Sequence, residues 1–271
     1  MKRSARLRGN PVRRGSGVLP AALAALLIVP LVPLVLWAVA DRWTGAVRLP
    51  QEFGLRGWRD ALDDGMVAAL VRSAILGAVV ALIATPLGAM AGRALGWRLV
   101  GRPGPPSVVL LAPVVLAPFA VAMGLNVAIL RVGVPGEVAV VLVLSVFALP
   151  YTTFTMRATY LRLNPGLEEQ ARVLGASPGQ ARRRVTVPAA ASGLITATGL
   201  AFLVGWSDYA VTLLIGGGQI ITAPMLIGSS AAGSGNDAST GVLAISASLP
   251  PLAALAVFTY LSALRRKVAR R

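Results

Sequence analysis

Six apolar segments, each close to the roughly 20 residues that a membrane-spanning helix needs, limit what this 271-residue chain can fold into. They lie at residues 18–40, 67–92, 107–130, 136–160, 189–215 and 241–264. Only 13% of the residues are charged, against about 25% in soluble domains, so the chain lacks the polar surface of a soluble protein. We therefore predict an all-α membrane protein with six transmembrane helices. Residues 41–65 are expected to form the main external loop, and residues 231–240 a flexible external stretch.

The basic residues are distributed by membrane side. Twenty of the 26 lysine and arginine residues fall in the N-terminal tail (1–17), the C-terminal tail (265–271), the link between the second and third segments, and residues 157–184. With Glu168 and Glu169 that side carries a net charge of +18, whereas the other side carries −2. Because cytoplasmic loops are enriched in Lys and Arg, we predict that both termini are cytoplasmic. The overall charge of +16 then reflects topology, and no nucleic-acid partner is predicted.

Several kinds of chemistry are excluded by residue types that the chain lacks. It contains neither cysteine nor histidine, which removes disulfides, thiolate nucleophiles, imidazole bases and the usual zinc ligands. Lysine occurs only at Lys2 and Lys267, both in the tails, so the phosphate-binding GxxxxGK[ST] loop is also missing. No paired carboxylates lie inside a span. We expect a protein that is not an enzyme and that binds no metal and no cofactor of its own.

The most informative stretch is the basic loop at residues 164–188, which reads NPGLEEQARVLGASPGQARRRVTVP. Asn164 and Ser177 stand where helix N-caps are expected, and each is followed by a proline, which suits the first helical position. Gly175 stands where a left-handed residue would end the first helix, and Gln180 has the capping-box spacing from Ser177. The pattern predicts two short capped helices, which are more ordered than a simple connection requires.

This loop resembles the EAA loop of bacterial ABC importer permeases. That motif reads Glu, two small residues, three variable positions, Gly, nine variable positions, an aliphatic residue, a variable position, an aliphatic residue and Pro. The matching positions here are Glu169, Gln170, Ala171, Gly175, Val185, Val187 and Pro188. The one departure is Gln170 in place of the first alanine. The place of the loop, between the fourth and fifth of six segments, also fits the family.

The resemblance implies a type I importer permease fold, with the permease domain over residues 18–264, in the bacterial inner membrane. In the family the first EAA helix docks into a groove of a cytoplasmic ATPase. Glu169, Ala171 and Gly175 would therefore contact that ATPase, and Pro188 would orient the fifth span. The implied partners are an ABC ATPase dimer that uses ATP, a second permease subunit (identical or related), an extracytoplasmic solute-binding protein and membrane lipid.

The resemblance also bears on the solute. The segments LPQEFGLRGWRDAL and GWSDYAVTLLIGG are similar to the spermidine/putrescine-type branch of the family, which makes a polyamine the first expectation. Relatives in that branch import ferric iron, aminoethylphosphonate or thiamine, and these stay open. A self-sufficient secondary carrier is the alternative from another class, because six spans would permit it. An intramembrane enzyme is more distant, since only an unactivated Ser or Thr would remain as nucleophile.

A candidate solute contact lies in the fifth apolar segment. Asp208 is acidic there, and a carboxylate costs roughly 2.5–3.5 kcal/mol at mid-bilayer, less near the interface. With Trp206 and Tyr209 beside it, Asp208 would suit an ammonium-bearing solute. The structural alternative is an ion pair with Arg72 or Arg131, with the aromatic rings as interface anchors. Other polar residues of the spans could likewise line the solute path or form hydrogen bonds between helices: Asn126, Ser145, Thr152, Thr153 and Thr155.

Overall fold

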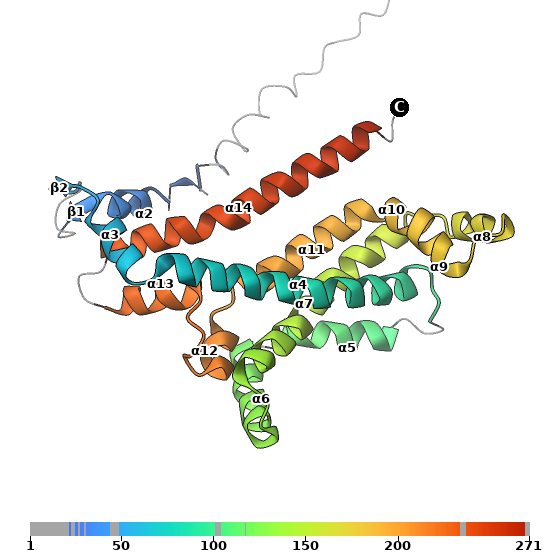
Figure 1. Ribbon diagram of the computed structural model, residues 1–271, viewed down its shortest axis with the longest axis horizontal. Coiled ribbons are helices and arrows are strands. Elements are labelled where there is room, and N and C mark those ends of the chain that lie inside the picture. Colours follow the sequence, from blue (N-terminus) through green and yellow to red (C-terminus); the bar gives the residue numbers. More distant parts are fainter. Residues whose placement is uncertain are drawn as a thin grey trace, which may run out of the picture.

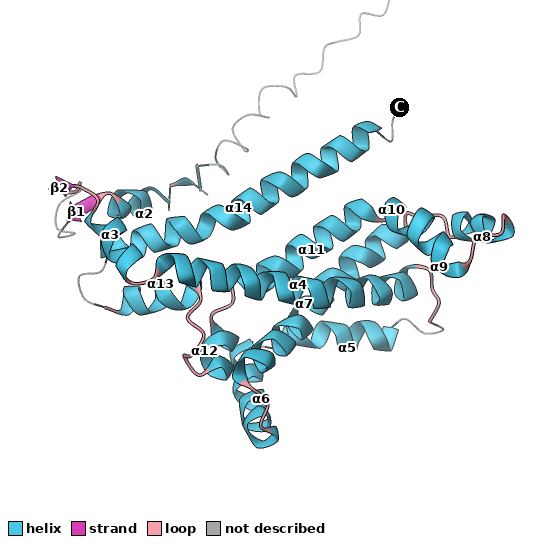
Figure 2. Cartoon of the chain, in the orientation of Figure 1, coloured by secondary structure: helices cyan, strands magenta, loops and turns pink. Residues whose placement is uncertain are grey.

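The computed structural model describes residues 22, 25, 26, 28, 29, 31–43, 49–100, 104–116, 118–233 and 237–268. Helices form almost all of this part of the chain, as Figure 2 shows. Two short strands, β1 (Ala40–Arg42) and β2 (Glu52–Phe53), pair antiparallel. The helices are α2 (Leu31–Ala38), α3 (Arg56–Asp63), α4 (Met66–Gly96), α5 (Gly104–Val115), α6 (Pro118–Val132), α7 (Gly136–Tyr160), α8 (Gly166–Val173), α9 (Pro178–Ala181), the π-helix η1 (Arg182–Thr186), α10 (Val187–Ala189), α11 (Ala191–Trp206), α12 (Ala210–Gly216), α13 (Ala223–Ala232) and α14 (Asp237–Val268).

Three long helices, α4, α7 and α11, pack against one another and form the main core (Figure 1). Val80 of α4, Leu144 of α7 and Ala201 of α11 are buried between them. α14 packs against α2 and α3, and α6 projects away from the core and packs mainly against α12. The strands, α3 and α13 lie at one end of the molecule, and α8 and α9 lie at the other.

Small residues allow α4 and α7 to approach closely. Gly88, Gly92 and Gly96 follow one another at intervals of four residues on the face of α4 that meets α7. A Cβ atom on Gly96 would lie 2.8 Å from the Cβ atom of Tyr160. Because lipid provides no hydrophobic drive between helices, such close backbone packing is a main source of helix association in membranes. The interval of four between these glycines is visible in the sequence and indicates close helix packing, whereas a hydropathy profile does not show it.

The second and fourth predicted spans are confirmed as the continuous helices α4 and α7. Both are long and apolar enough to cross a membrane, and up to four spans result in the described residues if each bent helix pair is counted as one. The sixth predicted span lies within α14, which runs towards the end of the molecule where α8 and α9 lie (Figure 1). The tail 1–17 lies outside the described residues, and the first span, 18–40, is described only in part. The count of six and the cytoplasmic termini remain predictions.

The third and fifth predicted spans are broken rather than continuous. The helical segments Ser107–Val115 and Phe119–Val132 meet at 101°. Pro118 begins α6, and a proline lacks an N–H and disfavours helical conformation in the residue before it. In the fifth span, α11 ends at Trp206 and α12 begins only at Ala210.

The predicted external loops contain more secondary structure than expected. Residues 41–65 include β2 and α3. Gly57 of α3 lies close to Ala238 of α14: a Cβ atom on Gly57 would be 2.8 Å from the carbonyl oxygen of Ala238. α13 occupies the region before residues 231–240, which were expected to be flexible and are partly helical. At its start, the backbone N–H of Ala223 donates to Ser73 Oγ of α4 at 2.8 Å. α3 and α13 therefore pack on the membrane helices.

Candidate functional site

The first helix of the loop at residues 164–188 is α8. The backbone N–H of Gly166 donates to Asn164 Oδ1 at 2.9 Å, so Asn164 binds the first N–H of this helix, although the N-cap position itself is Pro165 and not Asn164 as predicted. The regular helix begins at Gly166, one residue later than the sequence predicted. Glu168 and Glu169 stand in its first turn, where carboxylates interact favourably with the helix dipole. Residues next to one another in the chain therefore determine where α8 starts.

Gly175 ends α8 with a φ of +90°, the left-handed conformation that the sequence predicted. The N–H of Gly175 donates to the carbonyl of Arg172, and the N–H of Ala176 donates to the carbonyl of Ala171, both at 3.0 Å. These two bonds form a Schellman motif. A Cβ atom on Gly175 would meet nothing within 4 Å, so this chain requires the glycine for its backbone conformation rather than for space.

The second helix of the loop begins with the predicted capping box. The N–H of Gln180 donates to Ser177 Oγ at 3.3 Å, and the N–H of Ser177 donates to Gln180 Oε1 at 3.0 Å. The helix then changes to the π-helix η1, in which the N–H of Val187 donates to the carbonyl of Arg182. The wider turn comes just before Pro188, whose ring would clash with the carbonyl four residues earlier in a regular α-helix. A π turn was not predicted.

The three predicted contact residues and Pro188, which was predicted to orient the fifth span, are all at least partly accessible in this loop. Glu169 and Gly175 are exposed and Ala171 is half-buried, all three on α8 or its cap, whereas Pro188 is exposed at the start of the fifth span. A shallow hollow of about 490 Å³ lies between α8 and α9, lined by Glu169, Arg172, Val173, Ala176 and Pro178.

Two apolar residues of the same surface were missed by sequence reasoning. The side chains of Val173 and Leu174 are each 88% exposed, at the end of α8. No residue of α8 is buried, so these side chains have no core of this chain to pack into. Exposed apolar side chains bordered by charged ones are typical of protein interfaces. The signal was available as two adjacent large aliphatic residues just before a capping glycine.

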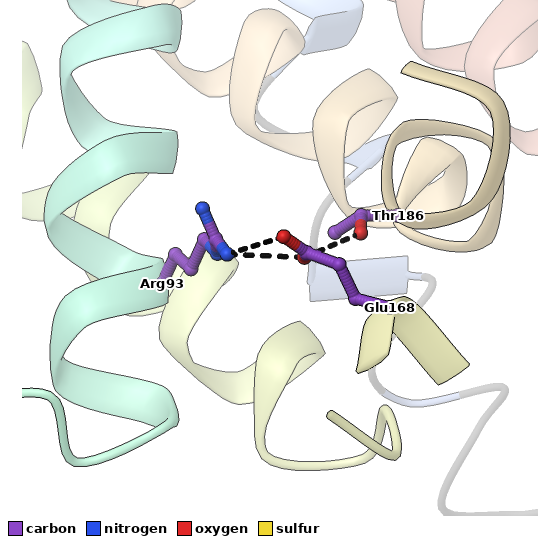
Figure 3. Close-up of polar contacts among 3 residues, drawn as sticks. All are labelled: Arg93, Glu168 and Thr186. Carbon is purple, nitrogen blue, oxygen red and sulfur yellow. Dashed lines mark hydrogen bonds and ion pairs between the residues drawn. The ribbon is translucent and has the colours of Figure 1, made fainter. Parts of the chain in front are cut away.

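Glu168 was also missed, and its side chain points inward. Arg93 Nη2, near the end of α4, donates to Glu168 Oε1 at 2.9 Å and to Oε2 at 3.0 Å (Figure 3). Thr186 Oγ1, at the end of η1, donates to Glu168 Oε2 at 2.9 Å. Of the two adjacent glutamates, Glu168 thus binds within the chain and Glu169 faces outward.

Trp206 occupies a structural position between α11 and α14. It is 4% exposed, and its Nε1 donates to the carbonyl of Ala247 at 3.2 Å. Its ring stacks on Phe202, with centroids 5.7 Å apart. The indole is therefore satisfied by contacts within the chain.

Asp208 lies in the break between α11 and α12 and caps the second of these helices. Its carboxylate accepts the N–H of Val211 at 3.3 Å, and the N–H and Oγ1 of Thr212 at 2.8 and 2.9 Å. The predicted alternative, an ion pair with Arg72 or Arg131, is wrong for the described residues. Arg72 instead lies 3.5 Å from the carbonyl of Ile221, to which it donates. The break leaves N–H groups of α12 without helical partners, and the nearest carboxylate binds them.

Tyr209 is the exposed member of the three residues, with 42% of its surface accessible. Its ring lies against α13, since a Cβ atom on Gly228 would be 2.8 Å from Tyr209 Cε2. The chain therefore places Trp206, Asp208 and Tyr209 around one helix break, and of these three only Tyr209 is exposed.

Three of the other polar residues of the spans make helix-internal bonds or line a hollow, whereas Thr153 is buried and its Oγ1 has no hydrogen-bond partner in the described part of the chain. Ser145 and Thr152 donate to carbonyls one turn earlier in α7. Thr155 lines a hollow of about 450 Å³ between the ends of α7 and α11, together with Thr159, Arg162, Ser192 and Thr196. Among the described residues no group of three or more Asp and Glu could hold a metal ion.

Known proteins share both the sequence pattern and the fold. Residues 65–268 match the family described as "Binding-protein-dependent transport system inner membrane component". The trehalose transport system permease protein SugB of Mycobacterium tuberculosis is 40% identical over 102 residues, 37% of each chain. The putative 2-aminoethylphosphonate transport system permease protein PhnV of Salmonella typhimurium is 27% identical over 207 residues, 75% of this chain and 77% of PhnV.

A solved structure supports the same architecture. A chain of a bacterial ABC transporter involved in import of the acidic polysaccharide alginate superimposes with a TM-score of 0.68, over 90% of this chain and 94% of the other, at 15% identity. The likeness concerns the fold alone. Because the family match covers three quarters of the chain, the protein is an inner-membrane protein that belongs to the family of binding-protein-dependent transport system inner membrane components.

Proposed function

We propose that this chain is the permease subunit of an ATP-driven importer and that a cytoplasmic ATPase binds the surface formed by Glu169, Ala171, Val173, Leu174 and Gly175, named here the α8 surface. The observation that carries the proposal is the 88% exposure of both Val173 and Leu174 on a helix that buries none of its residues. Burial of two such side chains in a partner would supply roughly 1.5–3 kcal/mol each.

The α8 surface combines apolar and charged groups in a way that suits a protein groove. Glu169 offers an exposed carboxylate for a cation on the partner, with no competing ion pair among the described residues. Gly175 has open space around its Cα atom, which allows a partner backbone to approach closely. In this proposal the partner ATPase, and not this chain, binds and hydrolyses ATP.

Pro188 would fix the orientation of the fifth span relative to the loop. It lies in α10, and the helical segment Pro178–Ala189 meets Ala191–Trp206 at an angle of 75°. A proline fixes its own φ and removes one hydrogen bond, so it keeps such a bend in a defined place.

A second permease subunit and an external solute-binding protein would complete the importer. Large apolar side chains on α5 and α6 are exposed, among them Val109, Val115, Leu130 and Val132 at 72–81%. α6 projects from the core, so it offers apolar surface to the second subunit and to lipid (Figure 1). At the opposite end from α8, the strands, α3 and α13 would meet the binding protein.

The solute is proposed to be a small polar organic molecule, with 2-aminoethylphosphonate to be tested first. The similarity to PhnV extends over 75% of this chain, whereas that to the trehalose permease covers 37%. A polyamine was the first expectation from the sequence. Neither of these relatives is named for polyamine transport, so the polyamine remains a prediction. Ferric iron and thiamine remain further alternatives.

The break between α11 and α12 is proposed to border the solute path. Tyr209 would contact the solute because its side chain is exposed. Asp208 and Trp206 would hold the break in shape through the capping bonds of Asp208 and the bond from Trp206 to Ala247.

Binding of the ATPase tests the α8 surface directly. The tagged full-length chain would be purified from membranes that contain its ATPase, with wild type compared with Leu174→Asp. Burying the new carboxylate would reduce the recovered ATPase by about tenfold or more. Leu99→Asp is the matched control, because Leu99 is 64% exposed outside the α8 surface. Full recovery of ATPase with Leu174→Asp would contradict the proposal.

Uptake assays test the solute and the class of transporter. A strain without this gene, the complemented strain and one with Leu174→Asp would be given labelled 2-aminoethylphosphonate, trehalose and spermidine in turn. We expect uptake of one solute to depend on the wild-type gene and to be lost in the variant. Uptake by the purified chain alone in liposomes would instead indicate a secondary carrier.

A further inference from the structure

α8 is joined to the membrane helices by a polar contact rather than by an apolar core. It packs chiefly on α9 and η1, and none of its residues is buried. The most enclosed carboxylate of its first turn is Glu168, whose side chain is 13% exposed. Its two oxygens accept three hydrogen bonds, two from Arg93 Nη2 and one from Thr186 Oγ1, at 2.9–3.0 Å. Figure 3 shows the three side chains meeting between α4, α8 and η1.

Arg93 is itself held in place by α4 and α7. Its guanidinium carbon lies 4.8 Å from the centre of the Trp97 ring, within the range of a cation–π contact. Trp97 Nε1 donates to the carbonyl of Tyr160 at 3.0 Å, and the two rings meet edge to face with centroids 5.2 Å apart. The partner of Glu168 is therefore anchored to the two helices that form the centre of the core.

Thr186 connects the same carboxylate to the fifth span. It is the last residue of η1, two residues before Pro188, and it is buried. A displacement of Glu168 thus acts on α4 through Arg93 and on the start of the fifth span through Thr186. π turns within α-helices are frequent at functional sites.

We infer that Glu168, Arg93 and Thr186 form a tether that makes α4 and the fifth span follow α8 when the ATPase moves it. The inference rests on the proposed function, because it assumes that the ATPase acts on α8. It assigns different tasks to adjacent glutamates: Glu169 faces the partner, and Glu168 passes its movement inward. Arg93, Glu168 and Thr186 are positioning residues, since each is argued to act through the bonds that it makes with the other two. A charge-assisted contact that is largely removed from water suits this task, because it resists extension more than an exposed ion pair does.

The first test measures the tether without the ATPase. The chain has no cysteine, so two introduced cysteines can carry a pair of spin labels in the full-length chain in lipid bilayers. The substitutions are Leu167→Cys in α8 and Met90→Cys in α4, at positions that are 44% and 59% exposed. A narrow distribution of label distances is expected in the parent. Glu168→Gln and Arg93→Gln should broaden it, and the exchanged pair Glu168→Arg with Arg93→Glu should narrow it again.

Matched controls and a milder variant keep this test decisive. Glu137→Gln and Arg131→Gln remove the same charges at exposed positions outside the tether and should leave the distribution unchanged. Thr186→Val removes only a hydroxyl group and should broaden the distribution less, which provides a readout if Glu168→Gln does not fold. A distribution in Glu168→Gln and Thr186→Val identical to that of the parent would overturn the inference.

The second test measures coupling in the complete importer in proteoliposomes. With Glu168→Gln we expect the ATPase to remain bound while the solute transported per ATP hydrolysed falls by about tenfold, because the loss of a largely buried charge pair weakens the contact between α8 and α4. The exchanged pair should recover most of the loss. An unchanged ratio in Glu168→Gln would overturn the tether. Failure of the wild-type chain to bind the ATPase at all would instead overturn the proposed function.

Discussion

Gly92 of α4 lies so close to Met156 of α7 that a Cβ atom on the glycine would be 2.6 Å from the Cβ atom of Met156. The same hypothetical atom would be 2.8 Å from the carbonyl oxygen of Thr153 and from the backbone N of Arg157. Two of these three neighbours are backbone atoms of α7, which cannot move aside independently. The distance between α4 and α7 therefore depends on the missing side chain at Gly92.

Enlarging Gly92 should separate these helices. We expect Gly92→Val to lower the free energy of unfolding by roughly 1–3 kcal/mol, because overpacking forces backbone shifts. Thermal unfolding of the detergent-purified protein would measure the loss. Gly124→Val is the control, since a Cβ atom on Gly124 of α6 would meet nothing within 4 Å. Equal stability of the two variants would argue against close packing of α4 on α7.

Trp206 provides a second prediction, about the contact between α11 and α14. Trp206→Phe keeps an aromatic ring beside Phe202 but removes the hydrogen bond to the carbonyl of Ala247. Loss of one such bond should cost about 1 kcal/mol and lower the midpoint of thermal unfolding by about 2–4 °C. Tyr260→Phe, at a position 65% exposed, should change the midpoint little. A Trp206→Phe variant as stable as wild type would show that this bond contributes nothing.

Substitutions of Asp208 can distinguish its role as a helix cap from a role of its negative charge in solute transport. Asn and Asp cap helices about equally well, whereas Ala does not, so Asp208→Asn should keep stability and Asp208→Ala should lose about 1 kcal/mol. If capping is the main task of Asp208, solute uptake should follow the same order. Uptake lost in Asp208→Asn, with stability unchanged, would show that the solute path needs the negative charge.

The parts of the loop at residues 164–188 that the sequence predicted are those that depend on close neighbours in the chain. Ser177 and Gln180 bind each other three residues apart, and the Schellman bonds around Gly175 reach back three and five residues. Short-range hydrogen bonds of this kind need no knowledge of the rest of the fold. The residue types at those positions were therefore sufficient.

The unpredicted parts depend on partners that are distant in the sequence. Arg93 and Glu168 are 75 positions apart, so no local pattern indicates that they meet. The same holds for Trp206 and Ala247, which are 41 positions apart. Hydropathy predicted where α4 and α7 run, but it does not say where an apolar helix stops. The breaks at Pro118 and Asp208 depended instead on a ring without an N–H and on a carboxylate that caps the following helix.

Substitutions at Gly175 can distinguish two requirements of the α8 surface: a left-handed backbone conformation at this residue and open space for a partner. A non-glycine residue at a φ of +90° is strained by roughly 1–2 kcal/mol, less for Asn, so Gly175→Ala should loosen the end of α8 more than Gly175→Asn. Gly175→Asp adds a charge to the surface proposed to enter the ATPase, and we expect it to abolish solute uptake while the protein still inserts in the membrane.

Uptake and ATPase recovery in the three Gly175 variants identify which requirement dominates. If the partner needs the space above the Cα atom, Asn should fail as Asp does, because any side chain would fill that space. If only the backbone matters, Asn should retain uptake where Ala loses it. Gly179→Ala is the control, since this glycine also has open space around it but no positive φ. Normal uptake by Gly175→Asp would contradict a partner at this surface, because a buried carboxylate without a cation could not be accommodated at the proposed contact.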